Sequence, residues 1–293
     1  MSRQFTLSSG ALRAEITERA AALRVLRRGE RDLVTSWPAD GAIPCYSGTL
    51  LAPWPNRVGG ASYSFAGRAH RLPVNEEDRG NALHGLVAEV AWEAVEDGRD
   101  HVRLAHTITP VPGYPFTLAL QVLYTLAPEG LTTTLTAQNL GEEAAPYGCG
   151  PHPWLLAGGD VEEYELHLPA GRVLLVDEAL LPRSLEDVSA TPYDFRTARV
   201  VGATAVDHAF TGLVPEDDGL AGVRVRGPEG GVGIRWEAAA MPWVQVCTGT
   251  GLDHAGLAVE PMTCPPDAFN SGTDLIVLQP GEKAEHSWTI FPC

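Results

Sequence analysis

Short runs in which apolar and polar residues alternate recur along most of the chain. Residues 62–72 alternate on both sides of Ala66-Gly67, which is the pattern of a β-hairpin. Alternation with a period of two points one side chain to the core and the next to solvent, and Val, Thr and aromatic residues favour such half-buried strands. The same pattern predicts strands at residues 116–126, 131–137, 243–248 and 286–291, and a second hairpin at 223–236 around residues 227–231.

Helical periodicity is scarce. Residues 15–27 have a composition that suits a helix, but the flanking Gly10 and Gly29 also suit a pair of strands, and we predict strands there. Strands and helices do not alternate as in a parallel nucleotide-binding sheet, and no repeat of solenoid or propeller period stands out. The pattern therefore predicts an all-β fold, a large antiparallel β-sandwich formed as a single domain by residues 1–293.

The composition agrees with a folded chain that has a substantial core. The chain has 293 residues, 44% of them hydrophobic, and its 31 Gly and 23 Pro are spread throughout, as many turns require. Its formal net charge is −16. An acidic surface repels phosphate backbones and anionic lipids, so nucleic acid and membrane surfaces are not expected as partners. Nothing in the sequence indicates the oligomeric state.

The cysteines favour a reducing compartment. There are five, an odd number, and no two form a CxxC pair, so neither a disulfide framework nor a zinc knuckle is predicted. The N-terminal residues lack the apolar segment of a secretory signal, and no stretch of about 20 apolar residues exists to cross a membrane. We therefore expect a cytoplasmic protein.

Candidate chemistry gathers in segments that are dense in polar and turn-forming residues. His152 lies between two prolines, which fix the backbone on both sides of its imidazole, and rigid placement suits acid–base work. Glu260 follows an apolar run and is predicted at a strand end, where a carboxylate also serves to cap a loop. Spacing alone leaves a structural role open for any single histidine, for Asp207 in a turn and for Arg57 in an ion pair. The segments are residues 53–60, 81–85, 148–154 and 259–267, with a weaker one at 206–210.

Other chemistries lack their motifs. The chain has no G-x-S-x-G elbow, no Gly-rich lysine loop for phosphates and no H-E-x-x-H pair. Asp207-His208 and Asp253-His254 are neighbouring donors, but adjacent side chains of a strand point to opposite faces, which works against chelation. No metal site is predicted.

Taken in order, these segments resemble the aldose 1-epimerase (galactose mutarotase) family. The resemblance covers about residues 50–270, most of the chain, and the run 260–270 is similar to a bacterial branch of that family. No single motif carries it, but the family order and plausible spacing of five motifs do. The motifs are Asn56-Arg57, Ala82-Leu83-His84-Gly85, Gly150-Pro151-His152-Pro153, Asp207-His208-Ala209-Phe210 and Glu260-Pro261.

The resemblance implies a β-sandwich with an open sugar cleft, and an enzyme that interconverts the α and β anomers of a free aldose without cofactor or metal. It implies Glu260 as the general base at the anomeric hydroxyl, His152 as the general acid at the ring oxygen and His84 as a second imidazole beside it. These roles need an ionised Glu260 and a protonated His152, and proximity of the two groups is expected to favour that state.

The resemblance also implies the residues that bind the sugar. Arg57 and Asp207 would orient its hydroxyls, with Asn56 beside Arg57. Trp154 would stack on an apolar face of the sugar, although a core role suits a tryptophan equally well. The family often has an aromatic pair after the Pro-His-Pro segment, whereas Leu155 follows Trp154 here, which puts the shape of the sugar floor in question.

Two other functions stay open at this point. One is an epimerase for an anionic sugar, a hexose 6-phosphate or a sulfonated sugar, whose anionic group would need a cationic pocket that Arg57 and Arg79 lie near enough to supply. The other is a non-catalytic sugar-binding sandwich, since fold does not dictate function. The presence of both His152 and Glu260 favours catalysis, because binding alone needs no acid–base pair.

Overall fold

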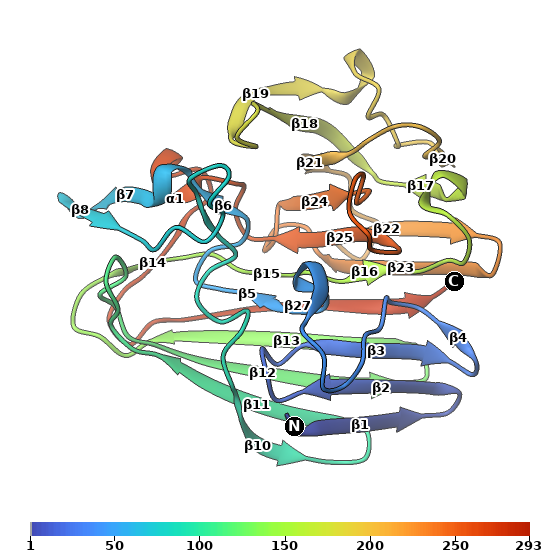
Figure 1. Cartoon of the computed structure of the whole chain (residues 1–293), viewed down its shortest axis with the longest axis horizontal. Helices are drawn as coiled ribbons and strands as arrows, with labels where there is room; N and C mark the ends of the chain where they lie inside the picture. The colour runs from blue at the N-terminus through green and yellow to red at the C-terminus, as the bar shows by residue number, and fades with distance from the viewer. Residues whose placement is uncertain (1) are drawn as a thin grey trace.

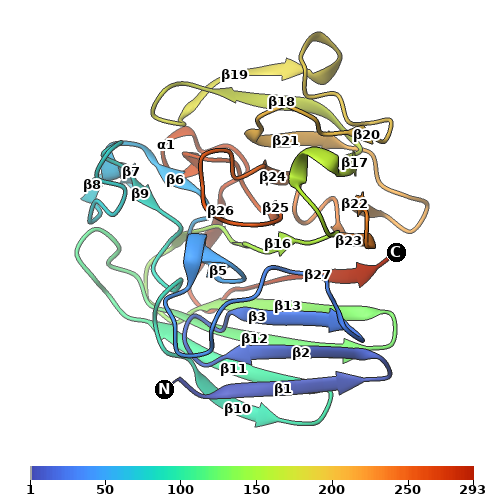
Figure 2. The same cartoon turned by 45° about the vertical axis from the view of Figure 1, so that its right-hand side comes forward.

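The computed structural model describes residues 2–293, and the chain is nearly all β, as predicted. Its first strands form a four-stranded antiparallel sheet in chain order, which lies alongside the green strands of the largest sheet in both views (Figures 1 and 2). The four strands are β1 (Gln4–Ser9), β2 (Leu12–Thr17), β3 (Leu23–Arg28) and β4 (Arg31–Asp32).

The largest sheet has nine strands and closes the other side of the core. It joins consecutive hairpins to the C-terminal strand β27, which inserts at its centre. In sheet order its strands are β10 (Glu93–Asp97), β11 (His101–Ile108), β12 (Leu118–Ala127), β13 (Gly130–Asn139), β27 (Lys283–Pro292), β23 (Gly230–Glu237), β22 (Leu220–Gly227), β17 (Glu165–His167) and β20 (Arg199–Val200).

A six-stranded sheet occupies the upper half of the molecule in Figure 1, where it overlaps β17, β20, β22 and β23 of the nine-stranded sheet in this view. It is antiparallel throughout and draws its strands from the second half of the chain. In sheet order they are β16 (Trp154–Leu155), β25 (Leu257–Met262), β24 (Trp243–Cys247), β21 (Asp207–Leu213), β18 (Ala170–Val176) and β19 (Pro182–Asp187).

Four two-stranded pairs and five short helical turns connect these sheets. The pairs are β5 (Leu50–Leu51) with β15 (Gly150–Pro151), β6 (Arg57–Val58) with β9 (Ala82–Leu83), β7 (Ser62–Phe65) with β8 (Arg68–Arg71), and β14 (Ala145–Tyr147) with β26 (Ile276–Leu278). The turns are η1 (Pro44–Tyr46), η2 (Gly59–Ala61), η3 (Val161–Glu163), η4 (Val188–Ala190) and α1 (Ala268–Ser271).

The predicted strands are all present. The hairpin predicted at residues 62–72 is β7–β8, the one at 223–236 is β22–β23, and residues 15–27 are the strand pair β2–β3 rather than a helix. The alternation is strict where a strand has one buried face: in β12 every second side chain, from Leu118 to Leu126, is buried. This period sets the inner face of the sheet.

One continuous core joins the N-terminal sheet to the larger sheets. Its largest fully buried side chains include Trp92, Trp236 and Tyr124. The buried hydroxyl of Tyr124 on β12 donates to the carbonyl of Ala21, 2.7 Å away in the turn between β2 and β3, which satisfies its polar end. Within the described chain, no helix has the length and apolar character that crossing a membrane requires.

Candidate active site

The strand register of the six-stranded sheet brings several polar side chains to one face. Glu260 on β25 lies directly opposite Gln245 on β24, and Gln245 lies opposite Ala209 on β21. Directly opposed residues point to the same side, and residues two apart do as well, so Asp207 shares this face. On the other flank Trp154 pairs with Ala258, which places Trp154 on the face of Glu260.

Glu260 lies within a strand, which corrects the prediction of a strand end. It is the fourth of six residues in β25, and all six are buried. The following Pro261 is tolerated because β16 pairs only with Leu257 and Ala258, so the ladder on that side has already ended. A carboxylate held in the middle of a buried strand has little freedom to move.

A second set of side chains approaches this face from the first third of the chain. β6 pairs with β9, and Arg57 lies opposite Leu83. His84 follows Leu83 in the chain, so this pairing places Arg57 and His84 side by side. His84 has a left-handed backbone (φ 61°) and the following Gly85 does too (φ 75°). A Cβ on Gly85 would lie 2.1 Å from the carbonyl oxygen of Ala52, so the turn that presents His84 requires glycine there.

The two imidazoles and the carboxylate predicted for acid–base work lie together. Nε2 of His152 is 3.5 Å from Oε1 of Glu260, and the ring centroids of His84 and His152 are 5.1 Å apart, edge to face. All three residues are buried, with 2% of Glu260 and 6% of each histidine exposed. The arrangement offers a proton acceptor and a proton donor within reach of one small molecule.

Burial determines the protonation of this group. Burial, with help from the charges of His254 and Arg57, lowers the pKa of His152 to about 4. Burial also lowers the pKa of His84, and the neighbouring His152 and Arg57 add to the effect. It raises the pKa of Glu260 well above its usual range, and Asp207 contributes.

Burial thus acts against the expected ion pair, because it shifts the pKa of each of the two groups toward its neutral form. A protonated carboxyl beside a neutral imidazole carries one proton, as does a carboxylate beside an imidazolium, so the pair holds a single proton in either arrangement.

Several buried polar atoms here have no hydrogen-bond partner among the described residues. They are two acceptors, Oε2 of Glu260 and Oε1 of Gln245, and two ring nitrogens, Nδ1 of His84 and Nδ1 of His152. Buried polar groups are nearly always paired, so a cluster without partners marks a place where a ligand supplies them. A molecule with several hydroxyl groups offers both donors and acceptors.

Asp207 and Gln245 form the side of the site next to Glu260. Nε2 of Gln245 donates to Oδ1 of Asp207 at 2.7 Å. This bond fixes the amide and leaves the second carboxylate oxygen of the half-buried Asp207 open for a donor. Sequence reasoning missed Gln245, although a single glutamine within the apolar run of β24 was a signal for a functional residue.

Arg57 is held by a carboxylate that sequence reasoning also missed. Its Nε and Nη2 donate to Glu76 at 3.0 and 2.9 Å, and both side chains are about nine-tenths buried. Arg79 and Asn81 donate to the same carboxylate at 3.1 and 2.9 Å. Although burial alone would raise it, these bonds and the Arg57 charge hold the pKa of Glu76 below its usual value.

Arg57 therefore has one nitrogen left to turn toward a ligand. This Nη1 makes a long bond of 3.3 Å to the side chain of Asn56, and the remaining donors of the guanidinium are committed to Glu76. Asn56 itself is 2% exposed and has a left-handed backbone, and its carbonyl accepts from the amide of His84 at 2.8 Å.

Trp154 packs between His152 and His254 at the edge of the site. Its ring stacks on His152, with centroids 5.8 Å apart, and the edge of His254 meets it at 4.7 Å. Only 1% of Trp154 is exposed, so its ring offers no open face of the kind expected for stacking on a sugar. The physical reason is packing: β16 carries Trp154 into the space between His152 and the loop of His254.

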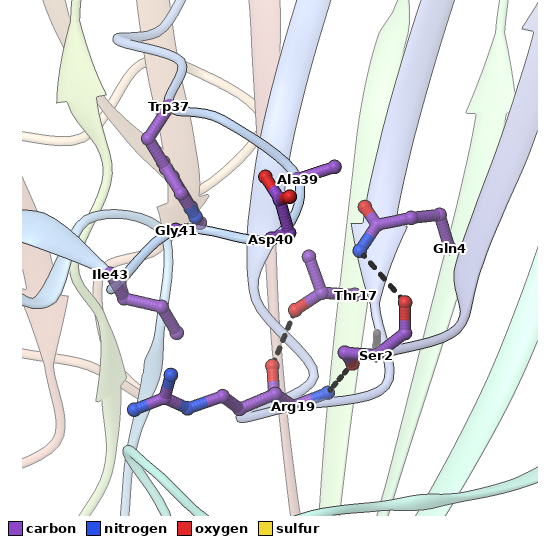
Figure 3. Close-up of a pocket in the computed structure, with 9 residues that line it drawn as sticks. All are labelled: Ser2, Gln4, Thr17, Arg19, Trp37, Ala39, Asp40, Gly41 and Ile43. Carbon is purple, nitrogen blue, oxygen red and sulfur yellow. Dashed lines mark hydrogen bonds between the residues drawn. The ribbon is translucent and has the colours of Figure 1, made fainter.

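A separate hollow of about 290 Å³ lies beside the N-terminal strands (Figure 3). Its polar groups bond one another in part: the amide of Arg19 donates to Oγ of Ser2 at 3.0 Å. No imidazole lines it, so the acid–base groups belong to the other site. Its lining residues are Ser2, Gln4, Thr17, Arg19, Trp37, Ala39, Asp40, Gly41 and Ile43. Among residues 2–293, no group of three or more His, Cys, Asp or Glu side chains is arranged to hold a metal ion.

Comparison with known proteins covers nearly the whole chain. The family profile described as aldose 1-epimerase matches residues 3–290. The protein YihR of Escherichia coli K12, described as uncharacterized, is 37% identical over 288 residues, which are 98% of this chain and 92% of YihR.

Two solved structures share the fold. A GalM/aldose epimerase homologue from C. elegans superposes with a TM-score of 0.87 at 17% identity, over 100% of this chain and 99% of the other. A putative aldose 1-epimerase from Escherichia coli K12 superposes with a TM-score of 0.84 at 23% identity, also over 100% and 99% of the two chains.

Proposed function

The chain belongs to the aldose 1-epimerase family, and we propose that it is a mutarotase that interconverts the α and β anomers of a free aldohexose without a cofactor. The observation that carries the proposal is the buried pair of His152 and Glu260, 3.5 Å apart, with His84 beside it. The partner is a small sugar, and the five cysteines, all free in the structure, are compatible with a cytoplasmic location.

A cyclic aldose opens when the anomeric hydroxyl loses a proton and the ring oxygen gains one. Glu260 takes the proton from the hydroxyl at C1 while His152 gives a proton to the ring oxygen. The bond between C1 and the ring oxygen breaks and leaves an aldehyde. Rotation about the C1–C2 bond exposes the other face of the aldehyde. As the ring closes, His152 takes its proton back from the hydroxyl that attacks C1, and Glu260 returns its proton to the aldehyde oxygen. Atoms and charge balance over the cycle.

The roles of the pair depend on where its single proton lies. Sugar hydroxyls that donate to Oε2 of Glu260 stabilise the carboxylate, because hydrogen bonds to the charged form lower a carboxyl pKa. The proton then passes to His152 across the short gap between the two side chains. Binding of the substrate thus converts the neutral pair of the free protein into the base and acid that ring opening requires.

The remaining side chains orient the sugar. Asp207 accepts from a hydroxyl through the oxygen that Gln245 does not use, and Nη1 of Arg57 donates to another. Arg57 and Arg79 already share the carboxylate of Glu76, so much of the positive charge that an anionic sugar would need is paired. A neutral aldose is therefore the primary proposal.

Anomer equilibration measured by polarimetry or NMR exchange tests the function. Freshly dissolved α-glucose, α-galactose, a hexose 6-phosphate and a sulfonated hexose are each followed with wild type, Glu260→Gln and the matched control Glu186→Gln on the exposed strand β19. Removal of the base is expected to slow the reaction by about 10²–10⁴, while the control stays at the wild-type rate. Glu260→Gln with more than a tenth of wild-type activity would refute the role of Glu260.

The substrate panel separates the other functions. Greater acceleration of the phosphorylated or sulfonated sugar would replace the neutral substrate with an anionic one. Tight binding of a sugar without any acceleration would make the protein a carbohydrate-binding sandwich rather than an enzyme.

A further inference from the structure

Tyr46 lies against two of the three side chains proposed for the chemistry. Its ring meets the ring of His84 edge to face, with centroids 4.6 Å apart at 64°, and stacks near His152 at 6.3 Å and 28°. Glu260 and the two histidines are buried, whereas Tyr46 is half-buried. The tyrosine is therefore the less buried neighbour of the imidazole pair.

An unusual turn places this ring. Cys45 and Tyr46 in η1 both have left-handed backbones, with φ of 45° and 53°. For residues other than glycine such a conformation is strained and persists only where surrounding contacts enforce it. The carbonyl of Cys45 accepts from Nε1 of Trp154 at 3.1 Å, and the carbonyl of Tyr46 accepts from the amide and the hydroxyl of Thr49 at 3.0 and 2.8 Å.

The same turn is bonded to the backbone of His152. The amide of Gly48 donates to the carbonyl of His152 at 2.8 Å, and the amide of His152 donates to the carbonyl of Thr49 at 3.0 Å. Gly48 has a φ of +73°, and a Cβ there would lie 2.0 Å from the carbonyl oxygen of Leu23. These hydrogen bonds join the turn to the His152 segment. They hold the strained backbone of Tyr46 in place and keep its ring beside the imidazoles.

The hydroxyl of Tyr46 is available to a ligand. Within residues 2–293 it makes no hydrogen bond, and it is not among the buried polar atoms that lack partners, so it is accessible to solvent. Burial and the charges of Glu89 and Glu76 raise its pKa, so the phenol stays a neutral donor.

We propose that Tyr46 is a substrate-binding residue that orients the sugar: its ring forms the wall of the cleft beside His84 and His152, and its hydroxyl donates to a sugar hydroxyl other than the one at C1. The proposal rests on the mutarotase function proposed above. The strained turn η1 would thus take part in substrate recognition.

The test compares Tyr46→Phe with a matched control. Tyr193 meets the ring of His208 with the same centroid distance of 4.6 Å at 61°, outside the proposed catalytic set, so Tyr193→Phe makes the same chemical change in a similar contact. Loss of one neutral hydrogen bond to the substrate is expected to raise KM about 2- to 12-fold for Tyr46→Phe, with kcat within about twofold of wild type. Tyr193→Phe should match wild type in both.

Deoxy sugars identify the bonded hydroxyl. With the 2-, 3-, 4- and 6-deoxy forms of the preferred aldose, the effect of Tyr46→Phe on KM should vanish for one form and persist for the others, because only one form lacks the partner of the phenol. An unchanged KM on the parent sugar, a loss confined to kcat, or an equal rise in KM across the whole series would each overturn the proposal.

A failure of the underlying function gives a different result. If wild type accelerates no sugar in the panel, the mutarotase proposal fails, and the same variants are compared by calorimetric titration with glucose and galactose. Weaker sugar binding by Tyr46→Phe than by Tyr193→Phe then supports the role of Tyr46. Equal binding, or no binding of either sugar to wild type, overturns it.

Discussion

The acid side of the pH–rate profile is the sharpest test of the buried pair. kcat/KM reports the ionisations of the free enzyme, and the active form proposed here is the pair with one proton. As the pH falls through the pKa of His152, the pair binds a second proton, no base remains and the rate falls. Burial lowers the pKa of His152 to about 4, from the 6.5 of a free imidazole, so activity is expected to persist far into the acid range.

A pKa of about 4 for His152 and the ordinary value of 6.5 predict very different activities at pH 5. With a pKa of about 4, about nine-tenths of the pair is in the active form at this pH, whereas a pKa of 6.5 would leave about 3% active. The groups that act on His152 from neighbouring elements are Glu260 on β25, His84 after β9, Arg57 on β6 and His254 in the loop after β24. Of these, His254 and Arg57 oppose its protonation.

The assay is anomer equilibration of a neutral aldose between pH 3.5 and 8. The spontaneous rate at each pH is subtracted, and intrinsic fluorescence confirms that the protein stays folded. A neutral substrate contributes no ionisation of its own. An acid limb with an apparent pKa between 6 and 7 would refute the reasoning, because it would mean that burial does not determine the protonation of His152. The alkaline limb is expected above the ordinary carboxyl range, since burial raises the pKa of Glu260.

Three further changes have defined outcomes. Asp207→Asn should raise KM about tenfold with little change in kcat, measured by the same equilibration assay, because it weakens a charge-assisted bond to the sugar. His286→Leu should reduce the loss of stability between pH 7 and pH 4 by about 3 kcal/mol in urea unfolding, because burial lowers the pKa of this core imidazole to about 4 while the unfolded chain is protonated from 6.5 downward. Gly85→Ala should lower the unfolding free energy by more than about 3 kcal/mol, because its Cβ would lie 2.1 Å from the carbonyl oxygen of Ala52.

Each of these has a matched comparison. A fall in kcat for Asp207→Asn as large as that for Glu260→Gln would show that Asp207 acts in the chemistry rather than in binding. The same replacement at His101, whose side chain is 42% exposed, removes no buried imidazole and should change the acid dependence far less. Equal effects at both sites would contradict the account of His286. Gly80 has a φ of +71° with nothing within 4 Å of an added Cβ, so Gly80→Ala measures backbone strain without the clash, about 1 kcal/mol. Equal losses at Gly80 and Gly85 would rule out the clash as the cause.

Local pattern was sufficient for the strands that were predicted. Alternation with a period of two depends only on neighbouring residues and on which face meets the core, so the hairpins β7–β8 and β22–β23 and the pair β2–β3 could all be predicted. The bracketing of His152 by two prolines is also local, and it correctly indicated a non-helical backbone. The prediction failed where a local rule was overridden: Pro261 suggested that a strand ends at Glu260, but the ladder beside it was already absent.

The amino-acid sequence by itself determined the all-β character, the turns and the residue types available for acid–base chemistry. Only the tertiary structure decided which of them meet. Pairing of β21, β24 and β25 gathers Asp207, Gln245 and Glu260 on one face. The hydrogen bond from Trp154 on β16 to the carbonyl of Cys45 in η1 helps to place Tyr46 beside the imidazoles. Protonation was decided at the same level, because a pKa depends on how deeply a group is buried and on the charges around it, and both arise from packing between segments that are distant along the chain.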